Sequence, residues 1–325
     1  MSYFGDETLV KCAENKMRYA QCSSLLICVV QESNGHGFVQ SSFSSHFVTV
    51  GSSLEEMEGM LLNDTCNVIA ALRSDLLNLA PSVKNSDRKF IVGNELMTKE
   101  PLAIVTRNDD REFSDIINWV VHAIFYGEEQ GLSKNSSLCQ NYTDLTSHHV
   151  SDLNFMNAVY CVGNYGEISD GELNHMGMNQ INNGTTGMLY ATPFGEMDDE
   201  DDELGDIDVT AGTLLGDIRK KGSLDCGVLI HDGFDGEITT SDKLFGMSVD
   251  YCRTLAAALF NGDSNLVNLT TYSENDKSSF VALNNGTIDI LSGGRVERKH
   301  DFEKSQSVGG VHFSTPYYYG NETAG

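Results

Sequence analysis

Apolar runs and helical patterns alternate in the part of the chain beyond residue 213. The runs at 226–230, 266–270 and 288–291 have the length and composition of buried strands. Helical patterns at 248–260 and 277–284 separate these runs. A βαβαβ order of this kind predicts a parallel sheet whose crossover connections are right-handed.

The first half of the chain repeats this pattern. Four apolar runs predict strands, at 25–30, 47–50, 66–70 and 90–92. Ser53 with Glu56 three residues later forms a capping box, which predicts the start of a helix that runs through Leu62. We therefore expect two similar α/β lobes in one chain.

Two further segments have clear patterns. Apolar residues recur at helical spacing over 114–126, so we predict an amphipathic helix there and interpret its Trp119 as a packing residue. The run at 197–208 is strongly acidic and lacks aromatic residues, which favours a solvated linker. A calcium site is the alternative, but the run lacks the twelve-residue EF-hand spacing.

The overall charge excludes some classes of partner. The 47 acidic residues outnumber the 21 Lys and Arg residues, and the formal net charge is −26. A field of this sign repels phosphate backbones, so we expect neither nucleic acid nor an anionic membrane surface as a partner. No apolar run approaches the length of a membrane span, and any export signal would lie outside this sequence.

Cysteines and glycosylation motifs favour an oxidising compartment. The eight cysteines match no common zinc spacing. Buried free thiols in a cytosolic protein are the alternative reading. Asn-x-Ser/Thr motifs, which give mild support for a secretory route, occur at Asn63, Asn135, Asn141, Asn183, Asn268, Asn285 and Asn321.

The two ends of the chain carry similar sequences. Residues 318–323 (YYGNET) resemble residues 3–8 (YFGDET) at an offset of 315. A cut through a tandem array or a circular permutation would produce such an echo. Both possibilities stay open.

An ordered series of motifs resembles one protein family, with its two halves in swapped order. The chain resembles the extracytoplasmic solute-binding proteins of amino-acid ABC transporters, of the general L-amino-acid type. The family's first part resembles 214–228 (LLGDIRKKGSLDCGV), 249–253 (VDYCR), 280–283 (FVAL) and 288–291 (IDIL). Its later part resembles 28–31 (CVVQ), 53–56 (SLEE), 66–68 (CNV), 98–102 (TKEPL), 108–110 (NDD), 117–121 (INWVV), 162–168 (VGNYGEI) and 187–194 (GMLYATPF).

The resemblance implies a fold and an organisation. We expect a circularly permuted, two-lobed periplasmic-binding-protein-like α/β fold, in which each lobe is a βαβαβ sheet flanked by helices. The second lobe would span 19–95, and the return to the first lobe with the C-terminal tail would span 96–196. The acidic linker would span 197–213, and the first lobe 214–325.

The resemblance also implies disulfide pairs. Cys28 with Cys66 and Cys226 with Cys252 would each lie within one lobe. The remaining local pairs would be Cys12 with Cys22 and Cys139 with Cys161. Each bridge would add roughly 2–4 kcal/mol by restricting the unfolded chain.

A ligand site between the lobes is implied as well. An amino-acid carboxylate needs an Arg fork, but His300 stands where the family's Arg is expected, so Arg295 or Arg298 would substitute. Leu72 stands where the family has the acidic partner of the ligand ammonium. The resemblance assigns ligand contacts to Arg295, Arg298, Phe234, Ser33 and Asn34.

Three functions follow, in order of preference. The first is binding of a small, amino-acid-like solute by hinge closure in an extracytoplasmic compartment, with neighbouring repeats of the same chain as further partners. The second is a repeated structural module that has lost the ligand. The third is a dehydratase-like enzyme using Glu32 or Glu297, but no catalytic motif supports it. We expect no catalytic residues, no cofactor and no metal, and we interpret His148 and His149 as solvated.

Overall fold

A computed structural model describes the chain in 17 stretches. These are residues 2–5, 7–14, 20–31, 34–44, 47–71, 76, 79, 91–93, 100–141, 149–150, 153–168, 179–181, 187–191, 213–230, 244–273, 278–296 and 310–320. The chain divides into two compact units. Unit 1 is Met1–Glu100 with Gly320–Gly325, and unit 2 is Pro101–Tyr319. The predicted linker at 197–208 lies outside the described residues.

Unit 1 contains a five-stranded sheet in the order β3-β2-β4-β1-β5. Strands β3, β2 and β4 are parallel, and β1 pairs antiparallel with both β4 and β5. Its elements are β1 (Ser2–Gly5), α1 (Glu7–Glu14), the 3₁₀ turn η1 (Ala20–Ser24), β2 (Ile27–Val30), α2 (Asn34–Ser42), β3 (Val48–Gly51), α3 (Leu54–Leu62), β4 (Val68–Ala71) and β5 (Ile91–Val92).

Unit 2 contains a six-stranded sheet in the order β10-β9-β11-β6-β12, and β13 also pairs with β6. Strands β10, β9 and β11 are parallel, whereas β6 is antiparallel to β11 and β12. Its elements are β6 (Glu100–Arg107), α5 (Arg111–Glu129), β7 (His149–Val150), β8 (Leu153–Asn154), the π-helical turn η3 (Ala158–Val162), α6 (Leu214–Lys221), β9 (Leu224–Ile230), α7 (Met247–Leu259), β10 (Val267–Ser273), α8 (Ser278–Asn284), β11 (Ile290–Arg295), β12 (Val311–Phe313) and β13 (Tyr318–Gly320).

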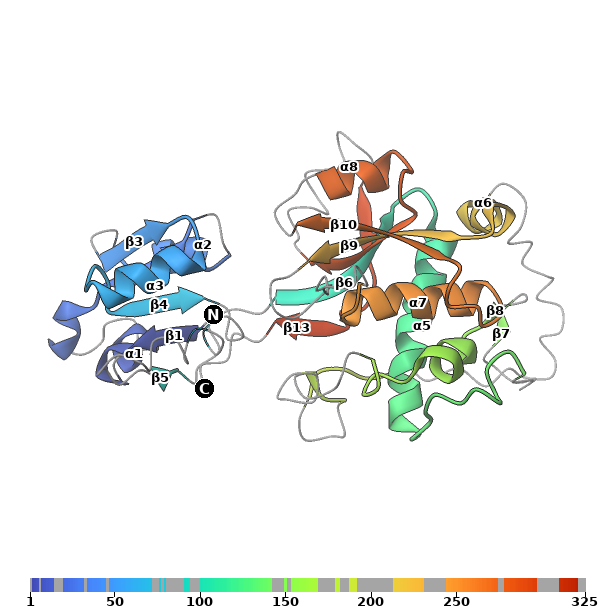
Figure 1. The fold of residues 1–325 in the computed structure, drawn as a ribbon, viewed down its shortest axis with the longest axis horizontal. Helices are drawn as coiled ribbons and strands as arrows, with labels where there is room; N and C mark the ends of the chain where they lie inside the picture. The colour runs from blue at the N-terminus through green and yellow to red at the C-terminus, as the bar shows by residue number, and fades with distance from the viewer. Residues whose placement is uncertain are drawn as a thin grey trace. The chain divides into compact units, whose positions relative to one another are not determined.

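The central part of each sheet is the predicted βαβαβ unit. The chain runs β2-α2-β3-α3-β4 in unit 1 and β9-α7-β10-α8-β11 in unit 2 (Figure 1). The expectation of two α/β lobes is therefore confirmed, and the permuted order stays a prediction. The three strands of each βαβαβ unit are parallel, as predicted, and one antiparallel strand that was not predicted, β1 or β6, pairs with the third parallel strand of each sheet.

Alternate residues of the central strands face different helices. In unit 2, Cys226 and Val228 pack in one core cluster with residues of α5 and α7, while Leu229 packs in another with residues of α8. Unit 1 has the same division. Ile27 and Val29 share a cluster with residues of α1 and α2, while Cys28 shares one with residues of α3. Successive side chains of a strand point to opposite faces, so both faces of these strands are covered.

The predicted helices form with small shifts at their ends. Helix α5 spans Arg111–Glu129, and Trp119 in it is partly buried against the large core cluster of unit 2, as expected of a packing residue. Helix α3 is capped by Ser53, whose Oγ accepts from Glu56 N at 3.2 Å. The Glu56 carboxylate accepts from Ser52 N at 2.6 Å, one residue before the position that a capping box predicts.

Four disulfides are present, and they match the four pairs that the resemblance implies. They join Cys12 to Cys22, Cys28 to Cys66, Cys139 to Cys161 and Cys226 to Cys252. None of the helices that the structure describes is long and apolar enough to cross a membrane.

Candidate functional site

The connectivity of each sheet indicates where a ligand would bind. In unit 2 the chain goes from β9 outward to β10 and then returns past β9 to β11, so the direction of winding reverses between β9 and β11. The same reversal lies between β2 and β4 in unit 1. In open α/β sheets, ligands bind outside the carboxyl ends of the strands at such switch points.

The residues predicted to contact a ligand follow these carboxyl ends in the sequence. Arg295 is the last residue of β11, and Arg298 follows three positions later. Phe234 follows β9, Ser33 follows β2, and Asn34 is the first residue of α2. Ser33, Phe234 and Arg298 lie outside the described residues, as does His300, and for Asn34 only the backbone is described.

A bulge in β11 precedes Arg295. Leu291 pairs with Val105, but Gly294 pairs with Ala103, so β11 has three steps where β6 has two. Gly293 takes a φ of +83°, and a Cβ on Gly294 would lie 2.2 Å from Val105 Cγ2. Both positions therefore require glycine. Bulges of this kind re-aim the side chains that follow them.

Backbone pairing fixes the carboxyl end of β11. Beyond the bulge, Arg295 pairs with Leu102, and Val296 N donates to Pro101 O at 2.9 Å. The side chain of Arg295 is partly buried. The backbone of Arg295 therefore belongs to a paired strand rather than to a loop, and positions on strands are held more precisely than positions on loops.

A buried tyrosine links the bulge to α7. The Tyr317 hydroxyl shares hydrogen bonds with Ser248 Oγ at 3.0 Å and with Ser292 Oγ at 3.3 Å. Its ring stacks on Tyr251 with centroids 4.1 Å apart. Burial raises the pKa of Tyr251, and its neighbours Tyr165, Tyr317 and Glu128 add to the shift. These residues hold the first turn of α7 against β11.

Sequence reasoning missed this tyrosine cluster. Tyr317 lies 69 residues from Ser248 and 25 residues from Ser292 in the sequence. None of the three stands in a recognisable motif. The family motifs quoted above end before Tyr317. Only the pairing of β6 and β11 gives a reason to look there, because Tyr317 N donates to Leu102 O at 2.9 Å.

Two charged networks lie at the opposite, amino edge of the unit 2 sheet. Lys221 Nζ contacts Asp225 Oδ2 at 2.7 Å and Asp289 Oδ2 at 2.6 Å. Burial alone would lower the pKa of Lys221, but hydrogen bonds to both aspartates and their charges outweigh it and raise that pKa. This network ties the starts of β9 and β11 together.

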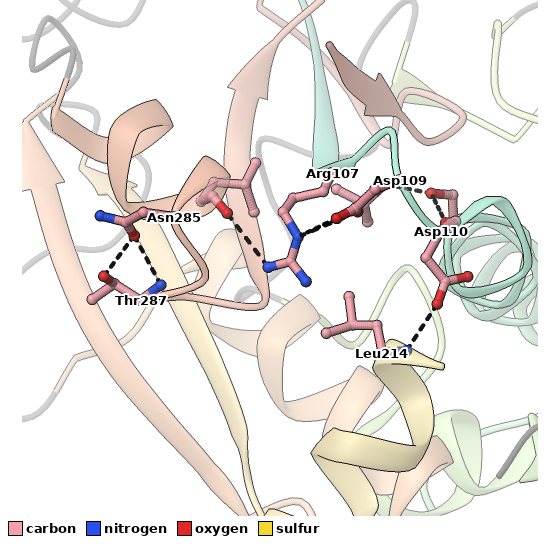
Figure 2. A network of polar contacts seen from close by, with 9 residues as sticks. Arg107, Asp109, Asp110, Leu214, Asn285 and Thr287 are labelled. Carbon is pink, nitrogen blue, oxygen red and sulfur yellow. Dashed lines mark hydrogen bonds and ion pairs between the residues drawn. The ribbon is translucent and has the colours of Figure 1, made fainter. Parts of the chain in front are cut away.

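The second network joins the end of β6 to neighbouring helices (Figure 2). Arg107 Nε contacts the Asp109 carboxylate at 3.3 Å, and Arg107 Nη1 donates to Leu283 O at 3.5 Å. Asp110 caps α5 through Phe113 N at 2.8 Å and accepts from Leu214 N at 2.9 Å. Asp110 thereby holds the start of α6. Both networks are structural.

The described residues contain no group of three or more His, Cys, Asp or Glu arranged to hold a metal ion. His148, Glu32 and Glu297 lie outside the described residues, and for His149 only the backbone is described, in β7. His122 is largely buried and shares a hydrogen bond with Thr315 Oγ1 at 3.1 Å. Burial lowers its pKa, against a smaller opposing effect of a hydrogen bond with the Tyr190 backbone.

Sequence comparison supplies relatives for the chain. No family model matches it. It is 37% identical over 112 residues to the amino-acid ABC transporter-binding protein YhdW of Escherichia coli K12, covering 34% of this chain and 30% of that protein. It is 26% identical over 218 residues to the general L-amino acid-binding periplasmic protein AapJ of Rhizobium johnstonii, covering 59% of this chain and 63% of that protein.

The chain is similar to amino-acid-type solute-binding proteins. The resemblance seen in the motifs is thereby confirmed. The alignments span about a third of the Escherichia coli relative and about three fifths of the rhizobial one. A solved periplasmic binding protein of Brucella ovis with glutathione bound matches with a TM-score of 0.42 at 18% identity, over 60% of this chain and 67% of that one.

Proposed function

We propose that the chain binds a small carboxylate-bearing solute of the amino-acid class at the carboxyl edge of β9 and β11, by hinge closure. The observation that supports this most is the β11 bulge, which ends in Arg295 at the switch point of the sheet. The bulge is formed by Gly293 and Gly294, which have no side chains, and Arg295 follows them as the last residue of the strand.

We propose that the ligand carboxylate makes the main contact, because the carboxyl edge of the unit 2 sheet has an arginine and the corresponding edge of unit 1 is followed by Leu72. A guanidinium matches two carboxylate oxygens, and Arg298 in the following segment supplies a second candidate fork. The corresponding edge of unit 1 ends at Ala71, and the next residue is Leu72 rather than an acid. A buried ammonium without an acidic partner costs several kcal/mol. We therefore propose that the carboxylate contributes more to affinity than the amino group.

The relatives support a location and a class. They are named as an ABC transporter-binding protein and a periplasmic binding protein, that is, for binding and not for a reaction. We propose that this chain is likewise an extracytoplasmic binding protein and no enzyme. Four disulfides suit an oxidising compartment. The echo between 3–8 and 318–323 supports neighbouring copies of the same sequence as further partners.

The experiment is thermal unfolding of the purified chain against amino acids, each paired with the 2-hydroxy acid of the same side chain. A ligand at 100 times its Kd stabilises the folded state by about 2.7 kcal/mol, which raises Tm by several degrees. We expect amino acids of one side-chain class to raise Tm selectively. The 2-hydroxy acid with the same side chain should produce most of that rise. If no compound in the panel raises Tm, the result would favour a structural module that has lost the ligand.

Two arginine variants locate the site. Arg295→Ala should abolish the ligand-dependent shift. Arg111→Ala removes the same charge from an exposed position on α5, where Arg111 Nε lies 3.8 Å from Asp115, and should leave the shift intact. Equal shifts in both variants would show that Arg295 does not contact the ligand.

A further inference from the structure

Two Asn-x-Thr motifs occupy equivalent turns in the two units. Asn63-Asp64-Thr65 follows α3 and precedes β4, and Asn285-Gly286-Thr287 follows α8 and precedes β11. Each turn connects the second helix of a βαβαβ unit to its third parallel strand. The segments 63–68 (NDTCNV) and 285–290 (NGTIDI) therefore correspond residue by residue.

The backbone hydrogen bonds of the two turns agree. Thr65 N and Cys66 N both donate to Met60 O, at 2.9 and 3.3 Å. Thr287 N and Ile288 N both donate to Ala282 O, at the same two distances. The middle residue is left-handed in each turn, with φ of +64° at Asp64 and +75° at Gly286. The two units therefore contain the same type of turn at equivalent positions.

The asparagine and threonine side chains also agree. Asn63 Oδ1 accepts from Thr65 N at 3.0 Å and from Thr65 Oγ1. Asn285 Oδ1 accepts from Thr287 N at 3.0 Å and from Thr287 Oγ1 at 2.6 Å, as Figure 2 shows. Two hydrogen bonds to the amide oxygen draw electron density from the amide and make its N–H groups more acidic. The hydroxyl therefore stands where it activates Nδ2.

Both motifs are open to an approaching reagent. All three residues of each motif are exposed. Within the described residues, no hydrogen bond holds Nδ2 of Asn63 or of Asn285, because both side chains are fixed through their oxygens. A group attached to Nδ2 would leave every hydrogen bond of the turn in place.

Two other described motifs differ. Asn268 lies in β10, and its Nδ2 donates to Asp225 Oδ1 at 2.8 Å and to Ser223 Oγ at 3.1 Å. Both of its N–H donors are therefore engaged. Asn135 is exposed, and its Oδ1 accepts from Ser137 N at 3.0 Å, but none of the described contacts joins it to the Ser137 hydroxyl. It has only the backbone half of the arrangement.

We propose that Asn63 and Asn285 are N-glycosylation sites, one on each unit, and that Asn268 is not. The donor is a polyprenyl-diphosphate-linked oligosaccharide. Its C1–O bond breaks and a bond from C1 to Asn Nδ2 forms, while Nδ2 loses one proton. The polyprenyl diphosphate leaves with the electron pair of the broken bond. The acceptor motif is of the kind found on the surface of secreted proteins.

The alternative role for these motifs is structural, since an Asn-x-Thr turn by itself ends a helix and satisfies its last carbonyls. The two roles make different demands on the threonine. The hydrogen bond from the backbone N–H to Asn Oδ1 can form with any residue except proline at that position, whereas transfer requires the hydroxyl. Thr→Ala and Thr→Ser variants therefore separate them.

The test is secretion of the full chain, behind an export signal, from a eukaryotic host, followed by enzymatic removal of glycans in heavy-oxygen water. That treatment converts each glycosylated Asn to a labelled Asp, which peptide mapping locates. We expect label at Asn63 and Asn285, less at Asn135 and none at Asn268. Thr65→Ala and Thr287→Ala should each remove one glycan, while Thr65→Ser and Thr287→Ser should retain it at reduced occupancy.

Two results would overturn the proposal. One is an unlabelled chain from cells that glycosylate a co-secreted control protein. The other is label at Asn268 equal to that at Asn63 and Asn285, since the hydrogen bonds of each Asn side chain would then not determine which motif is glycosylated. A Thr→Ala variant could lose secretion as well as its glycan. Asn63→Asp and Asn285→Asp separate the two effects, because they keep the acceptor oxygen of the turn and remove only the site of transfer.

Discussion

The two units share one framework and stabilise it differently. The strand registers make Cys28 in unit 1 equivalent to Gly227 in unit 2, and the turn makes Cys66 equivalent to Ile288. Unit 1 joins its pair by a disulfide. In unit 2 a Cβ on Gly227 would lie 2.6 Å from Ile288 Cδ1, so an apolar side chain fills the same space. A covalent bond and a packing contact thus occupy equivalent places.

The disulfides of β2 in unit 1 and β9 in unit 2 therefore lie on opposite faces of their equivalent sheets. Cys28 packs with residues of α3, the second helix of its βαβαβ unit. Cys226 packs with residues of α7, the first helix, and is bonded to Cys252 within it. The disulfide of unit 1 therefore joins β2 to the turn before β4, whereas that of unit 2 joins β9 to α7, so the same framework is stabilised by different covalent links.

A second pair of equivalent residues differs in charge. Asn67 Oδ1 in unit 1 accepts from Leu26 N at 2.8 Å, and Asp289 Oδ2 in unit 2 accepts from the equivalent Asp225 N at 2.8 Å. The unit 1 contact is neutral. The unit 2 contact is ionic, because Asp289 is 5% exposed and is paired with Lys221.

The largest expected effect comes from removing the central disulfides. Cys28→Ala with Cys66→Ala should destabilise unit 1, and Cys226→Ala with Cys252→Ala should destabilise unit 2, each by about 3–4 kcal/mol for loops of 38 and 26 residues. Trp119 is the one tryptophan and lies in unit 2, so its fluorescence follows that unit. Hydrogen exchange of β2 and α3 follows unit 1.

The comparison predicts that each double variant affects its own unit. The unit 1 variant should leave the Trp119 transition nearly unchanged, and the unit 2 variant should shift it strongly. Equal shifts of the Trp119 transition in both variants would mean that the two units unfold as one, and the comparison would fail.

A smaller effect is expected from the charged clamp. Lys221→Met should lower the stability of unit 2 by about 1–2 kcal/mol, since Lys221 is partly exposed and Asp289 keeps its bond from Asp225 N. Asn67→Ala in unit 1, which leaves Leu26 N without its acceptor, serves as the matched neutral case.

The clamps should differ in pH dependence. Burial alone would raise the pKa of Asp225, but hydrogen bonds from Lys221 and Asn268 and the charge of Lys221 lower it. A lowered folded pKa gives stability that is present above the unfolded value of about 3.9 and is lost as the pH falls through the folded value. The raised pKa of Lys221 gives stability present below about 10.4 and lost as the pH rises through the folded value.

Unit 2 should therefore lose this contribution at both ends of the pH range, and Lys221→Met should flatten the profile. Trp119 fluorescence during thermal unfolding between pH 3 and 11 measures it. A profile with the same curvature in Lys221→Met would exclude the clamp as its cause.

The smallest effect concerns the helix caps. Ser53 caps α3 in unit 1 and Thr213 caps α6 in unit 2, each accepting from a backbone N–H at 3.2 Å. Ser53→Ala and Thr213→Ala should each cost about 1 kcal/mol. Ser53→Thr and Thr213→Ser keep the acceptor and should cost less. Hydrogen exchange at Glu56 N and Gly216 N reports each cap directly, and unchanged protection in the alanine variants would contradict it.

Local pattern was enough to predict much of the framework. The central strands and helices of both units follow from runs of apolar residues and from helical spacing, because these arise from neighbours within a few residues. Strand ends were displaced where the pattern is ambiguous. Residues 288–289 are apolar or acidic ahead of β11, yet the strand begins at Ile290.

The candidate site was predictable only in part. The sequence and the family motifs located Arg295 just after a strand, but not the bulge that positions it or the Tyr317 contacts behind it. Those depend on β6, which pairs with β11 at Leu102 and Arg295, almost two hundred residues apart. No local pattern encodes such a partner.

The sequence by itself determined two βαβαβ units, their apolar faces and a resemblance that implied the four disulfide pairs. Each of these depends on spacing or on motifs that short segments carry. Tertiary structure alone decided that β1 and β6 insert antiparallel, that β11 bulges before Arg295, and that residues 63–68 and 285–290 form the same turn. The segments share only an Asn and a Thr, and their equivalence arises because each turn must deliver its strand to the same place in a sheet.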